Sequence, residues 1–125
     1  MSLRDELARC WNALNEGDPN AFLDLYDPEI ELFVPAWASP DSGVVRGADA
    51  VNRWYAHNFA QWSDQRWEMG ETFEDGSNVA YTLHWSARGK RSGVALAGTA
   101  FGTMTFHEGK IVTIVHLGFI GDGTT

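Results

Sequence analysis

Apolar residues recur every three or four positions at the start of the chain, which predicts an amphipathic helix over residues 2–15. Its apolar positions are Leu3, Leu7, Cys10, Trp11 and Leu14. Asp18 followed by Pro19 is a typical helix start and predicts a short second helix that runs through Tyr26. A third apolar stripe predicts a helix over residues 48–62, with its inward face formed by Val51, Trp54, Tyr55, Asn58, Phe59 and Trp62.

The remaining pattern is typical of strands. Residues 29–34 alternate between charged and apolar side chains, whereas residues 35–47 carry two prolines and two glycines and predict a long loop. Strand-like runs follow at residues 65–74, 78–88, 94–107 and 110–120, separated by short turn sequences. Three N-terminal helices followed by an antiparallel meander predict one α+β domain over residues 1–125, with the helices packed on one face of a curved sheet.

Charge and cysteine content exclude several classes of protein. The 125 residues include 9 Lys and Arg against 17 Asp and Glu, a net charge of −8. Such an acidic surface repels nucleic acids and anionic membranes, so we expect neither as a partner. No apolar run is long enough to span a membrane and the N-terminus does not resemble a signal sequence, so we expect a soluble, cytoplasmic protein. One cysteine, four dispersed histidines and no phosphate-binding glycine motif predict neither a metal site nor a cofactor.

Aromatic residues make up 13% of the chain, more than the core of a domain this small requires. Aromatic side chains in excess either line a cavity for a flat apolar ligand or cover a subunit interface. Both alternatives remain open at the level of the sequence.

Three segments together resemble a known family. They are GDPNAFLDLYDPEI at residues 17–30, VRGADAV at residues 45–51 and GKIV at residues 109–112. Their order and spacing resemble the nuclear transport factor 2-like superfamily, within it the SnoaL-like polyketide cyclase and ketosteroid isomerase branch. The resemblance implies a cone-shaped fold, in which three N-terminal helices and a strongly curved, mainly antiparallel sheet enclose an apolar pocket. It also implies a homodimer through the outer face of the sheet.

The family includes isomerases, cyclases, dehydratases, epoxide hydrolases and proteins without catalytic activity, so function depends on the residues of the pocket. The catalytic pattern of ketosteroid isomerases is absent, because Cys10, Val34 and Gly102 stand at the three matching positions. Only Tyr26 and Tyr55 match the supporting tyrosines of that pattern. The inward strand positions also lack the Asp–Arg–Asp set of limonene-type epoxide hydrolases. We therefore expect neither of these two activities by its usual mechanism.

His116 is the leading catalytic candidate. Strand alternation together with the resemblance places His116 inward with Val112, Ile114 and Gly118, and Ile111, Leu117 and Phe119 outward. An imidazole accepts and returns protons near neutral pH. The alternative is a structural histidine bonded to Tyr26 or Tyr55. These two tyrosines either donate hydrogen bonds to a carbonyl that becomes an enolate, or bond to each other.

Small residues at inward positions 98, 100 and 102 either leave space for a ligand or allow the sheet to curve. We expect a set of mainly aromatic side chains to bind an apolar molecule with one or two oxygens, such as a polyketide or terpenoid. The expected binding residues are Trp11, Trp37, Trp54, Phe59, Tyr81, Trp85, Met104 and Ile114.

Apolar residues at outward positions, among them Phe101, Val115 and Leu117, predict a homodimer through the outer sheet face. Three functions remain compatible with the sequence. The first is a cofactor-free isomerase, cyclase or dehydratase that acts on an apolar carbonyl compound by acid–base catalysis. The second is a protein that binds an apolar ligand without chemistry, and the third is a dimeric interaction domain whose own side chains fill the cone.

Overall fold

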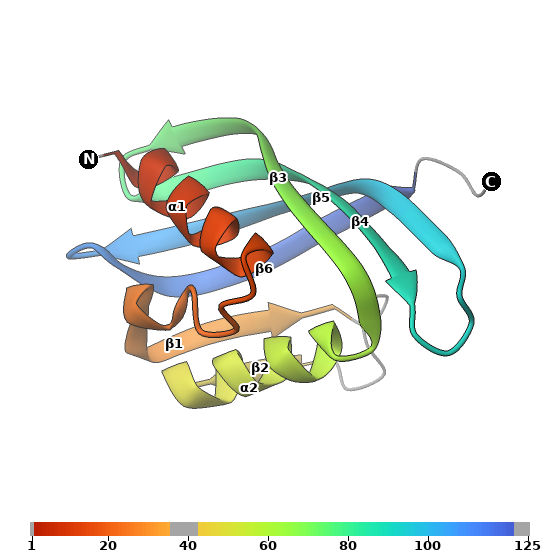
Figure 1. The fold of residues 1–125 in the computed structure, drawn as a ribbon. Coiled ribbons are helices and arrows are strands. Elements are labelled where there is room, and N and C mark those ends of the chain that lie inside the picture. Colours follow the sequence, from red (N-terminus) through yellow and green to blue (C-terminus); the bar gives the residue numbers. More distant parts are fainter. Residues whose placement is uncertain (1, 36–42, 122–125) are drawn as a thin grey trace.

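The structure is a computed structural model that describes residues 2–35 and 43–121. Within these ranges two α-helices and six strands follow one another along the chain (Figure 1). The elements are α1 (Leu3–Asn15), β1 (Tyr26–Val34), β2 (Gly43–Arg46), α2 (Ala48–Phe59), β3 (Trp62–Asp75), β4 (Asn78–Gly89), β5 (Ala95–His107) and β6 (Lys110–Gly121). Neither helix is long and apolar enough to cross a membrane.

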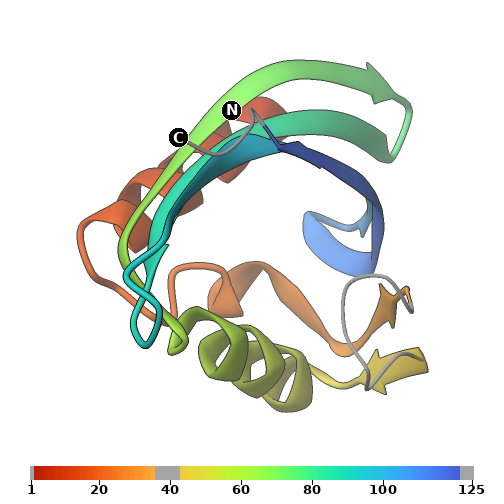
Figure 2. The same cartoon turned by 90° about the vertical axis from the view of Figure 1, so that its right-hand side faces the viewer.

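The six strands form one mixed sheet in the order β2-β1-β6-β5-β4-β3. Strands β1 and β6 pair in parallel, and the other neighbouring strands pair antiparallel. The sheet curves into an arch with α1 and α2 on its concave side, and it does not close because β2 and β3 remain its two edges (Figure 2). The core lies between the arch and the helices, where Leu7, Ile30, Val51 and Ile111 are fully buried.

The prediction of three N-terminal helices is wrong, since the described residues contain two α-helices. The predicted second helix is a turn followed by a single 3₁₀ turn at Leu23–Leu25, with hydrogen bonds from Leu23 N to Asn20 O and from Leu25 N to Phe22 O. The segment is only about two helical turns long, and Pro28 disfavours helical backbone at Asp27 before it. Burial of Phe22 and Leu25 then fixes the tighter 3₁₀ geometry.

Several predicted element boundaries also differ from the structure. Strand β1 begins at Tyr26, which the sequence placed in the second helix, and the predicted loop at residues 35–47 contains strand β2, which pairs with β1. Helix α2 ends at Phe59 because Trp62 already pairs with Gly89 in the sheet. Long-range pairing therefore overrides the helical spacing that includes Trp62.

Two irregularities in β6 decide which of its side chains face the helices. In the pairing with β5, Ile111 lies opposite the buried Phe106 and Thr113 opposite Thr105, so Val112 is an extra residue. A second extra residue, Leu117, stands between the pair His116–Gly102 and the pair Gly118–Phe101. A one-residue bulge reverses the alternation beyond it.

As a result Ile114 and His116 both face inward as predicted, because both lie in the regular segment between the two bulges. The predicted faces of Ile111, Gly118 and Phe119 are wrong. Ile111 is fully buried, and Phe119 lies opposite Ala100 with its ring 5.9 Å from that of Trp85 on the concave side.

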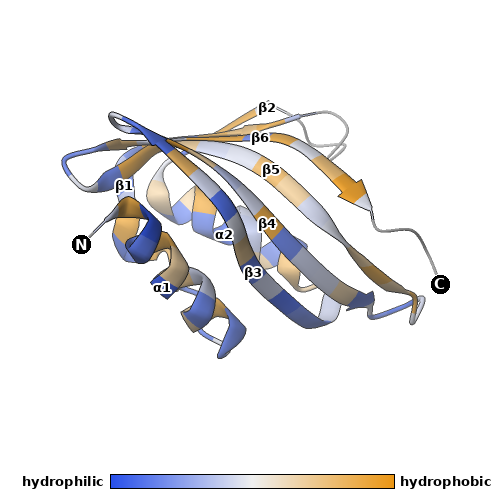
Figure 3. Cartoon of the chain, turned by 90° about the horizontal axis from the view of Figure 1, so that it is seen from above, coloured by the Kyte–Doolittle hydropathy of each residue, from blue (hydrophilic) through white to orange (hydrophobic). Residues whose placement is uncertain are grey.

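Helix α1 covers the free edge of β3. The Asn15 side chain donates from Nδ2 to the carbonyl oxygen of Trp67 (2.7 Å) and accepts from the Trp67 backbone N–H at Oδ1 (2.8 Å). The carboxamide thus takes the place of a neighbouring strand at this position. The polar side of α1 faces solvent, and the end of β6 is strongly hydrophobic (Figure 3).

Candidate functional site

A mostly apolar cavity of about 100 Å³ lies between the concave face of the sheet and the two helices. Its wall contains no Asp, Glu, Lys or Arg, and His116 supplies its one imidazole. The lining residues are Trp11, Leu14, Pro19, Phe22, Tyr26, Asn52, Tyr55, Phe59, Trp67, Tyr81, Leu83, Ala100, Met104, Ile114 and His116. An uncharged wall favours a neutral ligand, because a buried charge without a partner is strongly disfavoured.

The most polar part of the wall is a hydrogen bond of 2.8 Å between the Tyr55 hydroxyl and Nε2 of His116. Tyr55 projects from α2 and His116 from the segment of β6 between its two bulges. Trp54 packs on both, with its ring 5.1 Å from that of Tyr55 and 6.5 Å from that of His116. Trp54 therefore helps to hold the pair in place.

Burial determines the protonation of this pair. It lowers the pKa of His116 to about 4 from its ordinary value of 6.5, because the imidazolium would be poorly solvated. Burial also raises the pKa of the Tyr55 hydroxyl well above 10. At neutral pH both groups are uncharged, so the imidazole has one nitrogen able to accept a proton and the pair keeps one hydrogen-bond donor for a ligand.

The Tyr26 and Tyr81 hydroxyls also lie at the cavity, and burial raises the pKa of each. Neither hydroxyl has a hydrogen-bond partner among residues 2–35 and 43–121. The sequence left open whether Tyr26 and Tyr55 bond to each other, and the structure answers this, because Tyr55 bonds to His116 instead.

Most of the residues expected at the site lie together in the cavity wall. These are Trp11, Tyr26, Tyr55, Phe59, Tyr81, Met104, Ile114 and His116. Trp54 packs against the Tyr55–His116 pair without lining the cavity, and Trp37 lies outside the described residues. Trp85 is also absent from the wall, since its ring packs against Trp62, Trp67 and Phe119 at another part of the arch.

Several residues of the cavity wall were not expected there as binding residues. These are Leu14, Pro19, Phe22, Asn52, Trp67, Leu83 and Ala100. Signals for some of them were present: Asn52 stands three positions before Tyr55 on one helix face, and Leu83 and Ala100 occupy inward strand positions. For Pro19 and Phe22 the signal was missing, because their place depends on the irregular segment between α1 and β1.

The small residues of β5 do not leave the space that the sequence suggested. A Cβ atom added at Gly102 would lie 2.5 Å from the Tyr81 hydroxyl oxygen, and one added at Gly98 would lie 2.8 Å from Cε2 of Phe119. Aromatic rings from the neighbouring strands therefore occupy both positions. Only Ala100, between them, lines the cavity.

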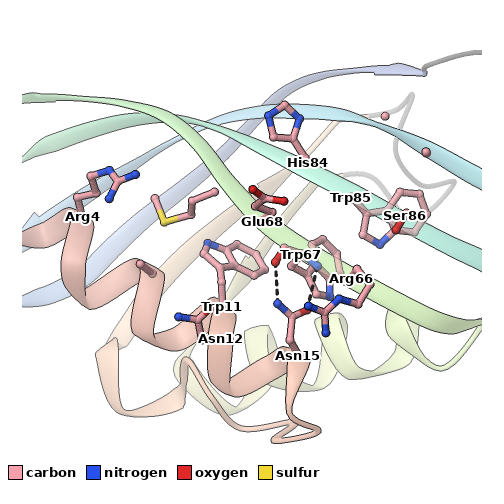
Figure 4. A pocket seen from close by; sticks show the side chains of 14 residues that line it. Arg4, Trp11, Asn12, Asn15, Arg66, Trp67, Glu68, His84, Trp85 and Ser86 are labelled. Carbon is pink, nitrogen blue, oxygen red and sulfur yellow. Dashed lines mark hydrogen bonds between the residues drawn. The ribbon is translucent and has the colours of Figure 1, made fainter.

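A wider groove of about 510 Å³ follows the edge of β3 next to α1 (Figure 4). Its wall contains the exposed side chains of Arg4, Arg66, Glu68 and His84, together with the Asn15–Trp67 hydrogen bonds. Charged side chains in contact with water are well solvated and do not converge on a ligand. Among the described residues, no three His, Cys, Asp or Glu side chains lie close enough to hold a metal ion. The apolar cavity is therefore the better candidate site.

Comparison with known proteins agrees with this architecture. The family described as the SnoaL-like domain matches residues 7–114. No curated protein matches the chain. An NTF2-like protein of unknown function from Burkholderia pseudomallei is 18% identical with a TM-score of 0.80, covering 94% of this chain and 91% of that one.

Two further solved structures share the fold. A hypothetical protein from Catenulispora acidiphila with a ketosteroid isomerase-like fold, in complex with trimethylamine, is 13% identical with a TM-score of 0.79, covering 94% of this chain and 87% of that one. The epoxide hydrolase/cyclase-like enzyme SalBIII, with a role in pyran ring formation in the polyether salinomycin, is 20% identical with a TM-score of 0.73, covering 91% and 88%. At these identities the likeness shows the fold alone.

Proposed function

Because the chain belongs to the family of SnoaL-like domains, we propose that its cavity binds a neutral, mainly apolar small molecule that carries a carbonyl group. We further propose that Tyr55 and His116 move a proton on this molecule in a cofactor-free isomerisation, cyclisation or dehydration. The observation that carries the proposal is the 2.8 Å hydrogen bond between an uncharged imidazole and a tyrosine hydroxyl in the wall of an apolar cavity.

The proposed roles follow from one tautomer of His116. When the proton is on Nε2, this nitrogen donates to the Tyr55 oxygen, and the Tyr55 O–H group is free to donate to the ligand's carbonyl oxygen. Nδ1, which has no partner among the described residues, then accepts the proton from the carbon next to the carbonyl. The electron pair of the broken C–H bond moves into the enolate, which Tyr55 stabilises.

An imidazole with a pKa of about 4 is a weak base on its own. The enolate that forms beside it makes the proton transfer more favourable, because its negative charge stabilises the imidazolium. Imidazolium and enolate would form side by side in a mostly apolar cavity, where opposite charges attract more strongly than in water. The proton then returns to the same or another carbon. Return to another carbon completes an isomerisation. In a dehydration the imidazolium instead gives its proton to a hydroxyl on the β-carbon, which leaves as water as the enolate electron pair forms the C=C bond and restores the carbonyl.

The size of the cavity limits what it encloses. An apolar cavity of about 150 Å³ holds benzene, and this one measures about 100 Å³. A polyketide or terpenoid would place only its reactive end inside, with the rest at the mouth beside the exposed Pro19 and the half-buried Asn52.

Deuterium exchange into cyclopentanone tests the proposed chemistry without knowledge of the natural substrate. The protein is incubated with the ketone in D₂O, and loss of the α-hydrogen signal is followed by proton NMR. We expect exchange above the buffer rate, a decrease of about a hundredfold or more in His116→Gln, and a smaller decrease in Tyr55→Phe. His84→Gln is the matched control, because His84 is exposed and outside the cavity. Exchange that is equal in wild type and His116→Gln would refute the catalytic role.

Binding without chemistry is the second candidate, favoured by the same low pKa of His116. Native mass spectrometry of gently purified protein distinguishes the two when combined with the exchange assay. A co-purified apolar molecule together with no catalysed exchange would indicate a binding protein.

We also propose that a second copy of the chain covers the outer face of the sheet. Apolar side chains on this face continue across four neighbouring strands, from Val44 and Phe33 through Val115 to Phe101 and Ile120. Val44, Phe33 and Ile120 are 41%, 39% and 63% exposed. A continuous apolar patch on a sheet is typical of an interface, and a two-fold dimer covers it with the same residues from both subunits.

A further inference from the structure

Tyr81, Gly102 and His116 are direct neighbours across three strands of the sheet. Tyr81 on β4 pairs with Gly102 on β5, and Gly102 pairs with His116 on β6. Paired residues point to the same side of a sheet. Tyr81 and His116 therefore stand on the concave face with one glycine between them.

The absence of a side chain at Gly102 allows the Tyr81 ring to lie across β5. A Cβ atom at position 102 would lie 2.5 Å from the Tyr81 hydroxyl oxygen and 2.8 Å from Cζ, far inside van der Waals contact. The end of the Tyr81 side chain thus occupies the space directly above Gly102. This position carries the hydroxyl from β4 toward His116 and its partner Tyr55.

The Tyr81 hydroxyl is open to the cavity and has no hydrogen-bond partner among the described residues. Tyr81 is 6% exposed, lines the cavity, and forms no hydrogen bond with any residue in the described ranges. Since no buried side-chain nitrogen or oxygen of the described residues lacks a partner, this hydroxyl is accessible from the cavity, and its O–H group is free to donate there. A ligand oxygen in the cavity would supply the missing partner.

We infer that Tyr81, held in place by Gly102, is a second hydrogen-bond donor to the ligand oxygen that Tyr55 binds. This inference rests on the proposed function and narrows its ligand class. A carbonyl oxygen has two lone pairs and accepts from both hydroxyls at once. An ammonium group would find no anionic side chain, and a carboxylate no cationic one, among the lining residues. The ligand is therefore a neutral carbonyl compound whose oxygen lies between Tyr55 and Tyr81.

Two measurements test this inference. The first compares thermal unfolding of the ligand-free variants Tyr81→Phe and Tyr55→Phe. Tyr81→Phe should melt at the wild-type temperature or slightly above it, since it removes an unpartnered hydroxyl. Tyr55→Phe should melt several degrees lower, because it breaks the bond to His116.

The second measurement compares the binding of cyclopentanone and methylenecyclopentane, followed by NMR titration. These molecules have the same shape, and only the first has an acceptor oxygen. Wild type should prefer the ketone, and Tyr81→Phe should lose about three- to tenfold of this preference. Gly102→Ala should lose a similar factor, because the added methyl group displaces the Tyr81 ring. Gly118→Ala is the matched control, since a Cβ atom there has ordinary contact at 3.5 Å from Phe101.

The outcomes separate the inference from the proposed function. If wild type binds neither molecule, the proposed ligand class fails and the inference fails with it. If Tyr55→Phe abolishes the preference while Tyr81→Phe retains it, the function stands and the inference is wrong. A decrease of several degrees in the melting temperature of Tyr81→Phe would also overturn it, because the hydroxyl would already be bonded within the protein.

Discussion

The burial of His116 makes the stability of the fold depend on pH in a predictable way. The imidazole has a pKa of about 4 in the folded chain, against 6.5 for an ordinary histidine. Between these values the unfolded chain binds a proton that the folded chain does not. Since protons then favour the unfolded state, the contribution of the neutral, partly buried His116 is fully present above pH 6.5 and decreases as the pH falls toward 4.

The size of the effect follows from the two pKa values. Relative to pH 8, His116 should lower the free energy of unfolding by about 2 kcal/mol at pH 5 and about 3 kcal/mol at pH 4. These losses are a large fraction of the stability of a small domain, which is about 5–15 kcal/mol.

The assay is urea unfolding of wild type and His116→Gln at several pH values between 8 and 4. Glutamine does not titrate and keeps polar atoms that can bond to the Tyr55 hydroxyl. All carboxylates and the three other histidines are common to both proteins, so they cancel in the difference between the two curves. We expect wild type to lose about 2 kcal/mol more than the variant by pH 5. Parallel curves for the two proteins would show that His116 binds its proton as readily in the folded as in the unfolded chain, and would refute the lowered pKa of the imidazole.

Two further predictions concern structure outside the cavity. In urea titrations, Asn15→Ala should lower the free energy of unfolding by about 1–3 kcal/mol, because the Trp67 N–H and C=O groups lose their partners. Asn12 is exposed on the same helix, so the control variant Asn12→Ala should change the free energy of unfolding by less than about 0.5 kcal/mol. Wild type should elute as a dimer in size-exclusion chromatography with light scattering, and Phe33→Glu should shift it to a monomer, whereas a monomeric wild type at tens of micromolar would contradict the proposed interface.

The parts of the fold that local sequence determines were predictable. Ser2 caps α1 by accepting from the Asp5 N–H at 3.1 Å, and the apolar stripe behind it buries Leu7, Cys10 and Trp11 as the spacing predicts. Local signals are weaker where tertiary contacts compete with them. The segment after Pro19 has a helix start and apolar spacing, yet it forms only turns because Tyr26 enters the sheet.

The faces of β6 show a different limit of sequence analysis. Alternation is reliable only between bulges. The sequence does not mark Val112 or Leu117 as an extra residue, because neither position is occupied by a proline or a glycine. The inward position of His116 could be predicted because it lies between the two bulges. Its partner could not, because Tyr26 and Tyr55 were both within reach, and only the packing of α2 against the sheet distinguishes them.

The aromatic content led the sequence analysis toward a large ligand, and the structure gives a physical reason for a smaller one. At one part of the arch the rings pack on one another: Trp85 lies 5.0 Å from Trp62, 5.9 Å from Trp67 and 5.9 Å from Phe119. Side chains of the protein itself fill this part of the concave side. The third functional alternative, a dimeric interaction domain, supposed that they fill the whole cone. The remaining space, near Tyr55, Tyr81 and His116, is where the polar atoms gather. Apolar packing and polar side chains are thus separated along the same sheet, so a ligand of the proposed kind would gain its specificity from the few atoms that reach the polar end.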